Sequence, residues 1–448
     1  MSRHPPPYWG EGANQQGITV PTEPFEPELV VEDEAERSWA RRLGPGLVKG
    51  AADDDPSGIA TYSQAGAQFG FGLLWTVLLT YPLMVAIQSI SARMGRVTGA
   101  GLAANLRRHY PSQILYAAVM LVLIANTINI AADLAAMGAA VKLVLGGAVP
   151  VYIVLLGTAS LLLQVFVPYD RYARFLKWLP LTLLAYVAVP FVVRLDWKAV
   201  GLSLIKPPIP LSGHYLITVV AVLGTTISPY LFFWHASQEV EEIRSEPAQE
   251  ALLHAPKQAG GQLRRINVDT WISMAMSNGV AFFIILATAA TLHVHRTGLA
   301  TFADAASALK PVAGPFAFLL FGLAIIGTGF LALPVLVGSA AYAAAGAMNW
   351  RNSVALQVNL AKQFYVVMAV AIFGGVTLTF AHFDPIDALY WAAVVNGLAA
   401  VPIMVLVMLM SARREIMGEF VVTGLLRWVG WIATAVMGLA AVGMFWPA

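Results

Sequence analysis

Residues 50–66 read GAADDDPSGIATYSQAG, and apolar sequence flanks this stretch on both sides. Three carboxylates, Asp53 to Asp55, lead directly into Pro56, which disfavours a continuous helix through this point. Lipid solvates neither ions nor free backbone groups, so charges at a helix break inside an apolar segment predict a site. The alternative is a loop between two helices whose acidic side chains lie in water.

The composition is that of a membrane protein. Of the 448 residues, 58% are hydrophobic and 12% are charged, whereas soluble domains carry roughly 25% charged residues. Cysteine is absent, which excludes disulfides, thiolate metal sites and a cysteine nucleophile. Residues 1–40 are rich in proline and acidic side chains and have no apolar core. We therefore expect a disordered cytoplasmic tail there rather than a signal peptide.

Eleven apolar runs follow, each long enough to cross a bilayer, which takes about 20 residues. They lie near 44–70, 73–92, 113–138, 149–167, 176–193, 214–238, 270–293, 314–347, 362–381, 386–410 and 426–446. If the N-terminus is cytoplasmic, 21 of the 27 Lys and Arg residues fall on the cytoplasmic side, as the positive-inside rule requires. We expect a multi-pass protein of the cell membrane with an extracytoplasmic C-terminus. The long interior connection 239–268 is predicted to be a solvated cytoplasmic loop.

The sixth run contains a second break. Residues 224–242 read GTTISPYLFFWHASQEVEE, and Pro229 leaves carbonyl groups near Thr225 without a helical donor. If each half of the chain has five helices, the first and sixth runs correspond, and matching interruptions in inverted repeats point to a transporter's midplane site. This pattern predicts an all-α integral membrane fold. The repeats are expected at 41–194 and 195–412, with an eleventh helix in 413–448.

The residues at the two breaks predict a cation site built from oxygen ligands. Asp55 offers a carboxylate, Ser228 a hydroxyl and Thr225 a carbonyl. Asp54 adds negative charge close by. Such ligands suit hard ions such as Mg²⁺, Ca²⁺ or Mn²⁺ better than Zn²⁺ or Cu⁺, and small residues leave room for the water that Mg²⁺ retains. The ion would be transported, and no further cofactor is expected.

Two other polar groups lie inside apolar runs. Asp133 follows Asn129 by four positions, so both share one helical face. This face is either a polar or proton pathway or a set of hydrogen bonds between helices. His235 either titrates near neutral pH or is an ordinary buried histidine.

These segments resemble the Nramp family of divalent-metal transporters. The first break resembles the family signature Asp-Pro-Gly-Asn, and the sixth run resembles the family's Met-Pro-His helix, within a similarity that extends over about residues 44–410. The resemblance implies a LeuT-like fold of five-plus-five inverted repeats with discontinuous first and sixth helices. It also implies that Asp55 is a metal ligand and that Asn396 lies on a helix that approaches the ion.

Several family positions carry other residues in this chain. The signature asparagine, a metal ligand in the family, falls on Gly58, and the methionine credited with favouring transition metals falls on Ser228. The histidine after the proline falls on Tyr230, and an acidic residue of the third helix falls on Ala136. This pattern is similar to the Nramp-related magnesium transporters, in which a larger site takes a more hydrated ion.

The sequence predicts a secondary transporter that moves a divalent cation by alternating access, Mg²⁺ before Mn²⁺, and that is no enzyme. Its expected partners are the ion and the lipid bilayer, without nucleic acid, and a monomer is expected while an oligomer stays open. The alternatives are a proton-coupled Mn²⁺ or Fe²⁺ importer, a sodium-coupled symporter of organic solutes, and a channel. An intramembrane hydrolase with paired Asp55 and Asp133 lacks a supporting motif, and no GxxxxGK[ST] loop indicates ATP-driven pumping.

Overall fold

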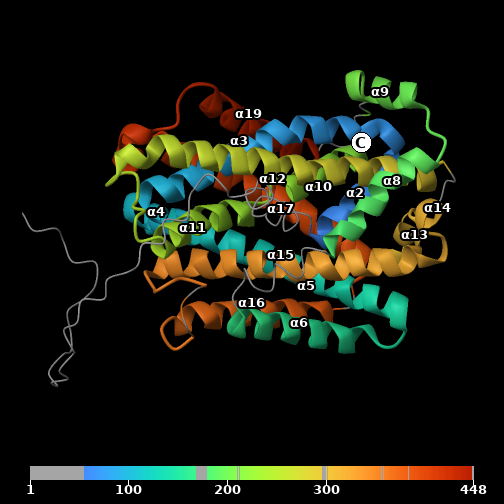
Figure 1. Ribbon diagram of the computed structural model, residues 1–448, viewed down its shortest axis with the longest axis horizontal. Coiled ribbons are helices and arrows are strands. Elements are labelled where there is room, and N and C mark those ends of the chain that lie inside the picture. Colours follow the sequence, from blue (N-terminus) through green and yellow to red (C-terminus); the bar gives the residue numbers. More distant parts are fainter. Residues whose placement is uncertain are drawn as a thin grey trace, which may run out of the picture.

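The computed structural model describes residues 55–167, 179–294 and 299–445, apart from positions 209, 211, 300, 355, 357 and 382. This part of the chain is helical and contains no β-strand, which confirms the predicted all-α class. The long helices lie alongside one another and run horizontally in Figure 1. The predicted tail, residues 1–40, lies outside the described residues.

Each of the eleven predicted runs contains at least part of a described helix. In chain order, these are α2 (Pro56–Phe69), α3 (Leu74–Thr98), α5 (Ser112–Leu145), α6 (Val149–Phe166), α8 (Leu184–Val192), α10 with α11 (Gly213–Thr226 and Pro229–Ser245), α12 (Ala259–Thr288), α15 (Ala317–Met348), α16 (Lys362–Thr379), α17 (Pro385–Ser411) and α19 (Gly424–Gly443). In the described residues, nine segments are long and apolar enough to cross a membrane, one of which joins α2 to α3.

Shorter elements connect these helices. The short α-helices are α4 (Leu102–His109), α9 (Trp197–Ile205), α13 (Phe302–Ser307), α14 (Lys310–Ala313) and α18 (Arg414–Met417). The short 3₁₀-helices are η2 (Gly70–Leu73), η3 (Pro180–Leu183), η4 (Pro256–Gln258), η6 (Gly314–Phe316) and η7 (Gly418–Phe420). The element η5 (Ala289–His293) is a short π-helix. In Figure 1, α4 lies near one end of the bundle, whereas α9, α13 and α14 lie near the other.

The second predicted break separates α10 from α11 at Ile227 and Ser228. Pro229 is the first residue of α11, where a helix needs no backbone donor. The Ser228 hydroxyl donates to the carbonyl oxygens of Gly224 (2.7 Å) and Thr225 (3.2 Å). It therefore satisfies acceptors that the proline leaves free. At the first predicted break, α2 begins at Pro56, and the residues before Asp55 lie outside the described part.

Glycines allow both halves of this interrupted helix to pack closely on long neighbours. A Cβ on Gly224 of α10 would collide with the Ala393 carbonyl of α17. A Cβ on Gly95 of α3 would likewise collide with the Ala236 carbonyl of α11. Small residues at such crossings are typical of helix packing in membranes. These contacts fix the position of the break within the bundle.

Three helices at the margin of the bundle present large apolar side chains outward. In Figure 1, α6 and α16 form the lower edge. Leu155 of α6, Val370 of α16 and Leu439 of α19 are all more than half exposed. A water-exposed surface of this kind would be unfavourable, whereas hydrocarbon solvates it. The chain is thus a multi-pass membrane protein.

Residues 239–268 form the predicted solvated loop only in their middle part, 246–258, where most residues are exposed. Helix α11 continues to Ser245 and α12 already begins at Ala259. Glu239 is only 4% exposed, because arginines from two other helices pair with it. The prediction was wrong for the two helical ends of this stretch, because the arginines that pair with Glu239 are distant in the chain and the sequence alone gives no reason for a glutamate to be buried there.

Candidate functional site

Asp55 is a buried carboxylate at the start of α2. Its side chain is the N-cap of that helix and is 1% exposed. Oxygen Oδ1 accepts hydrogen bonds from the Ser57 hydroxyl and the Gly58 amide, both at 2.7 Å. Oxygen Oδ2 accepts from the Asn129 amide at 3.0 Å and from the Tyr230 hydroxyl at 3.4 Å. Four donors therefore hold the Asp55 carboxyl group in place.

The polar face of α5 reaches this carboxylate. Asn129, which is fully buried, donates to Asp55 and accepts a hydrogen bond at 3.2 Å from Asn396 of α17. Asp133, one turn further along α5, is also fully buried. The Asp55 charge and the Ser57 amide act on it electrostatically, although neither of its oxygens has a hydrogen bond of normal geometry within the described residues. The structure therefore brings α2, α5 and α17 together at one polar point.

The interrupted helix supplies the opposite side. Thr225 and Ser228 are buried, and a Cβ on Gly58 would lie 3.1 Å from the Thr225 hydroxyl and 3.5 Å from Asp55 Oδ1. The absence of a side chain at Gly58 thus lets the two breaks approach each other. Tyr230, in the first turn of α11, completes the link to Asp55.

Several oxygens around Asp55 lack a hydrogen-bond partner among the described residues. They are the Thr225 hydroxyl, the Asn396 side-chain carbonyl and both oxygens of Asp133. Buried polar atoms are nearly always satisfied, so such a group indicates a water or an ion that binds there. Two carboxylates in apolar surroundings remain anionic together only where positive charge lies nearby. In the described part of the chain, no Lys or Arg pairs with either of them.

The other predicted site residues lie around this point or away from it. Pro56 and Pro229 each begin a helix, α2 and α11. His235 lies further along α11 and lines a separate cavity of about 20 Å³ with Glu239 and Asp269, which is room for about one water. Asp54 lies outside the described residues.

Sequence reasoning did not assign roles to two groups that contact Asp55. From the sequence, Ser57 had no individual role and Tyr230 was expected only to replace a histidine, yet both hydroxyls donate to the carboxylate. A signal for Ser57 was present, because a serine two residues after an N-cap aspartate can turn back toward it. No signal in the sequence pointed to the Tyr230 contact.

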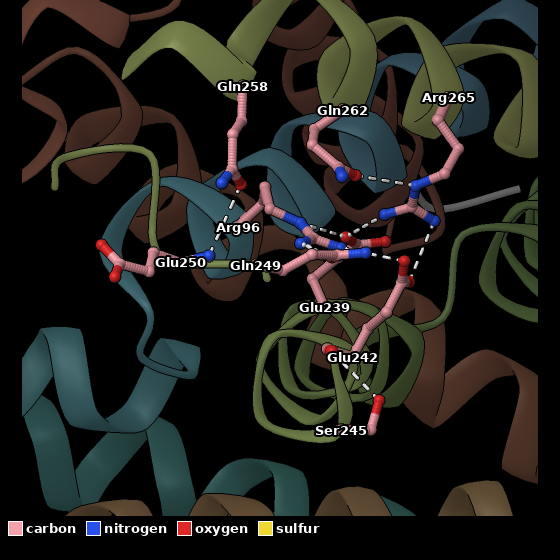
Figure 2. Close-up of polar contacts among 9 residues, drawn as sticks. All are labelled: Arg96, Glu239, Glu242, Ser245, Gln249, Glu250, Gln258, Gln262 and Arg265. Carbon is pink, nitrogen blue, oxygen red and sulfur yellow. Dashed lines mark hydrogen bonds and ion pairs between the residues drawn. The ribbon is translucent and has the colours of Figure 1, made fainter. Parts of the chain in front are cut away.

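A second polar cluster lies on α11, away from the break (Figure 2). Two arginines and two glutamates form what we call the arginine–glutamate cluster: Arg96 of α3, Glu239 and Glu242 of α11, and Arg265 of α12. Arg96 pairs with both glutamates, at 2.9 and 3.1 Å, and Arg265 pairs with both at 2.6 and 3.0 Å. The cluster ties the half-helix that carries Tyr230 to two long neighbours.

The connector between α11 and α12 is part of this arrangement. Gln249 accepts a hydrogen bond at 2.6 Å from Arg96, as Figure 2 shows. The Leu252 and Leu253 amides donate to the carbonyls of Arg96 and Val97 at the end of α3. Residues 246–258 are therefore attached to the bundle at Gln249, Leu252 and Leu253, while most of them are exposed.

A buried carboxylate that faces an interrupted helix, within a bundle of membrane-long helices, defines a multi-pass membrane transporter. The chain belongs to the Nramp family, since the family profile described as "Natural resistance-associated macrophage protein-like" matches residues 46–447. This confirms the family that the sequence resembles.

Individual relatives agree with this assignment. The chain is 28% identical over 407 residues to a protein named Divalent metal cation transporter MntH from Klebsiella pneumoniae, which covers 88% of this chain and 91% of the relative. A protein of the same name from Burkholderia ambifaria is 27% identical over 424 residues, or 91% of this chain and 88% of the relative. The names are those of transporters, and the chain is not an enzyme.

The fold agrees with a solved structure of the same family. A manganese transporter from Eremococcus coleocola superposes with a TM-score of 0.69 at 17% sequence identity, covering 91% of this chain and 87% of that one. At this level of identity the likeness concerns the fold. It confirms the LeuT-like arrangement of five-plus-five helices, followed here by the eleventh helix, α19.

Proposed function

We propose that the chain is a secondary transporter that moves a divalent metal cation across the membrane by alternating access. The observation that carries this proposal is the Asp55 carboxylate, buried between two helix starts and surrounded by unpartnered oxygens. A cation between Asp55 and the break at Ser228 and Pro229 would satisfy these oxygens and neutralise the buried charge. The names of the relatives support the same class of cargo.

Mg²⁺ is the favoured ion and Mn²⁺ the next. Every candidate ligand of the site is an oxygen: the Asp55 carboxylate, the Thr225 and Ser228 hydroxyls and the Asn396 carbonyl. Oxygen ligands suit hard ions. Mg²⁺ keeps several of its waters, so one or two carboxylates from the protein are enough to bind it. The Gly58 amide donates a hydrogen bond to Asp55. Because Gly58 has no side chain, it provides space next to Asp55 but no side-chain ligand atom.

A methionine introduced at position 228 supplies a sulfur ligand and tests the ion preference. We expect wild-type protein to bind Mg²⁺ and Mn²⁺ more tightly than Cd²⁺, and Ser228→Met to bind Cd²⁺ about tenfold more tightly than wild type, since thioether sulfur prefers soft ions. Isothermal titration calorimetry on purified protein measures these affinities. Ser89→Met, a buried change in α3, is the control. Tighter binding of Cd²⁺ than Mg²⁺ by wild type would contradict the assignment.

A proton-coupled importer of Mn²⁺ or Fe²⁺ is the second candidate function. One observation favours it: Asp133 is a buried carboxylate that accepts no hydrogen bond of normal geometry from the described residues, one turn from Asn129. Such a group is a candidate proton carrier. Against it, Ala136 leaves the next turn of α5 without an acid. We therefore favour uncoupled transport.

Internal pH distinguishes the two candidates. We expect little acidification of proteoliposomes during Mg²⁺ or Mn²⁺ uptake, because Asp133 has no second acid on its helical face to pass a proton onward. A pH-sensitive dye inside the vesicles measures this, and Asp133→Asn should leave the pH trace unchanged. Acidification that follows uptake in wild type and is lost in Asp133→Asn would establish proton coupling instead.

The orientation and the repeats complete the proposal. The cytoplasmic side is the end at which α3 and α11 end and α12 begins, because Lys and Arg gather there. The N-terminus then lies in the cytoplasm and the C-terminus outside. Residues 41–194 and 195–412 form the two inverted repeats, and 413–448 contain the eleventh helix. Protease accessibility of tags at the two termini of sealed vesicles tests this orientation.

A further inference from the structure

A second cavity lies apart from Asp55, between α4 and the ends of α11 and α15. Its volume is about 390 Å³, which is in the size range of small-molecule sites, roughly 300 Å³ and above. Small residues, among them Gly101, Ala104 and Ala345, line one side and leave the space open. Ser237 and Tyr342 are buried at its inner surface, whereas Arg108 and Asn349 are exposed at its rim. The cavity therefore reaches the protein surface.

The charges of this cavity are mainly positive. Three arginines line it, Arg107, Arg108 and Arg244, and Glu241 is the one acidic residue among its described lining residues. Glu241 already accepts hydrogen bonds from the Ser353 hydroxyl at 2.6 Å and the Tyr342 hydroxyl at 3.1 Å, and lies 3.4 Å from Arg244. Two positive charges thus remain without an acidic partner inside the cavity.

Neutral oxygens hold two of the three arginines, Arg107 and Arg244, in position. Arg107 donates to the Asn349 side chain at 2.6 Å, and Arg244 donates to the Asn352 carbonyl at 2.6 Å. An amide oxygen orients a guanidinium group but leaves its charge in place. The Nε of Arg107 is buried and has no hydrogen-bond partner in the described part of the chain. The cavity therefore offers fixed positive charge and a free donor.

This chemistry is opposite to that of the Asp55 site. A cavity with excess positive charge repels a divalent cation, so it is no continuation of the cation site. Guanidinium groups match the paired oxygens of a phosphate and bind it through short, charge-assisted hydrogen bonds. Basic cavities between membrane helices bind anionic headgroups for the same reason. We propose that this cavity binds a phosphate-bearing anion, either the headgroup of an anionic lipid or a free phosphate compound.

The experiment uses the full chain in nanodiscs and metal-free buffer, with two sources of phosphate. In the first arm, inorganic pyrophosphate is titrated calorimetrically into protein in phosphatidylcholine nanodiscs. In the second, the melting temperature is compared between pure phosphatidylcholine and nanodiscs that contain phosphatidylglycerol. The test variant is Arg107→Gln with Arg108→Gln, which removes the two charges that have no acidic partner among the described lining residues. The control is Arg351→Gln, an exposed arginine close in the chain that does not line the cavity.

We expect wild type and Arg351→Gln to respond alike in one arm and the double variant to bind at least about tenfold more weakly, since it loses two charged donors. A response to pyrophosphate identifies a free phosphate compound, and a response confined to phosphatidylglycerol identifies a lipid. Ala104→Leu fills the cavity while all three arginines stay, and it should abolish the same response. The proposal is overturned if neither arm separates wild type from the double variant, or if folded Ala104→Leu responds fully.

Discussion

Asp55→Asn is expected to lower metal uptake by at least about 100-fold, because it removes the carboxylate that links the two helix starts. Asparagine is as good an N-cap as aspartate, so α2 should still begin at Pro56. The loss then reports the charge rather than the helix. Uptake of Mg²⁺ and Mn²⁺ into proteoliposomes measures the effect.

The matched control for this experiment is Asp387→Asn. Asp387 is an exposed acid in the first turn of α17 and lies far in the chain from either break. The Asp387→Asn variant should therefore transport the metal at the wild-type rate. Elution as a single peak from a size-exclusion column establishes that both variants are folded. Metal uptake at the wild-type rate by folded Asp55→Asn would contradict the assignment of Asp55 as a metal ligand.

Arg96→Met is expected to destabilise the protein by about 3–5 kcal/mol, the usual effect of removing one partner of a buried ion pair. Arg96 is fully buried and Glu239 nearly so. Without Arg96, the two glutamates of the arginine–glutamate cluster would share Arg265 alone, and Gln249 would lose its donor. The midpoint of thermal unfolding in detergent, followed by tryptophan fluorescence, measures the change.

Two further variants make this result specific. Arg96→Met combined with Glu239→Met removes both charges and should recover much of the lost stability, since a buried pair is replaced by apolar contacts. Arg414→Met, at an exposed position outside the cluster, should leave the midpoint within a degree or so of wild type. An Arg96→Met midpoint equal to that of Arg414→Met would show that the cluster contributes nothing to stability.

The sequence is most informative where a local rule is broken. Pro229 interrupts an apolar run and must end a helix, and the structure places the interruption there. Asn129 and Asp133 share a face of α5 because they are four residues apart, and this face does point at Asp55. Such features depend on neighbours in the chain, so a single sequence contains them.

Contacts between residues that are far apart in the chain cannot be predicted from a single sequence by such local rules. Arg96 and Glu239 are 143 positions apart, and Asn129 and Asn396 are 267 apart. The charge pattern of Glu239 and Glu242 equally fits a solvated helix end. Only the ion pairs with Arg96 of α3 and Arg265 of α12 determine that Glu239 is buried. The role of Tyr230 has the same origin, since its hydroxyl reaches a different helix start.

A cation that binds Asp55 would compete with the protein's own hydrogen-bond donors for the lone pairs of this carboxylate. Oδ2 accepts from Asn129 on α5 and from Tyr230 on α11, so it ties α2 to both neighbours. A cation that coordinates this oxygen must displace one of these donors or lengthen its bond. The ion-free carrier is then the more firmly tethered of the two forms. If the proposed function holds, ion binding loosens a contact of α2 with α5 or α11, and the ion then has a different affinity for the conformations before and after these helices separate.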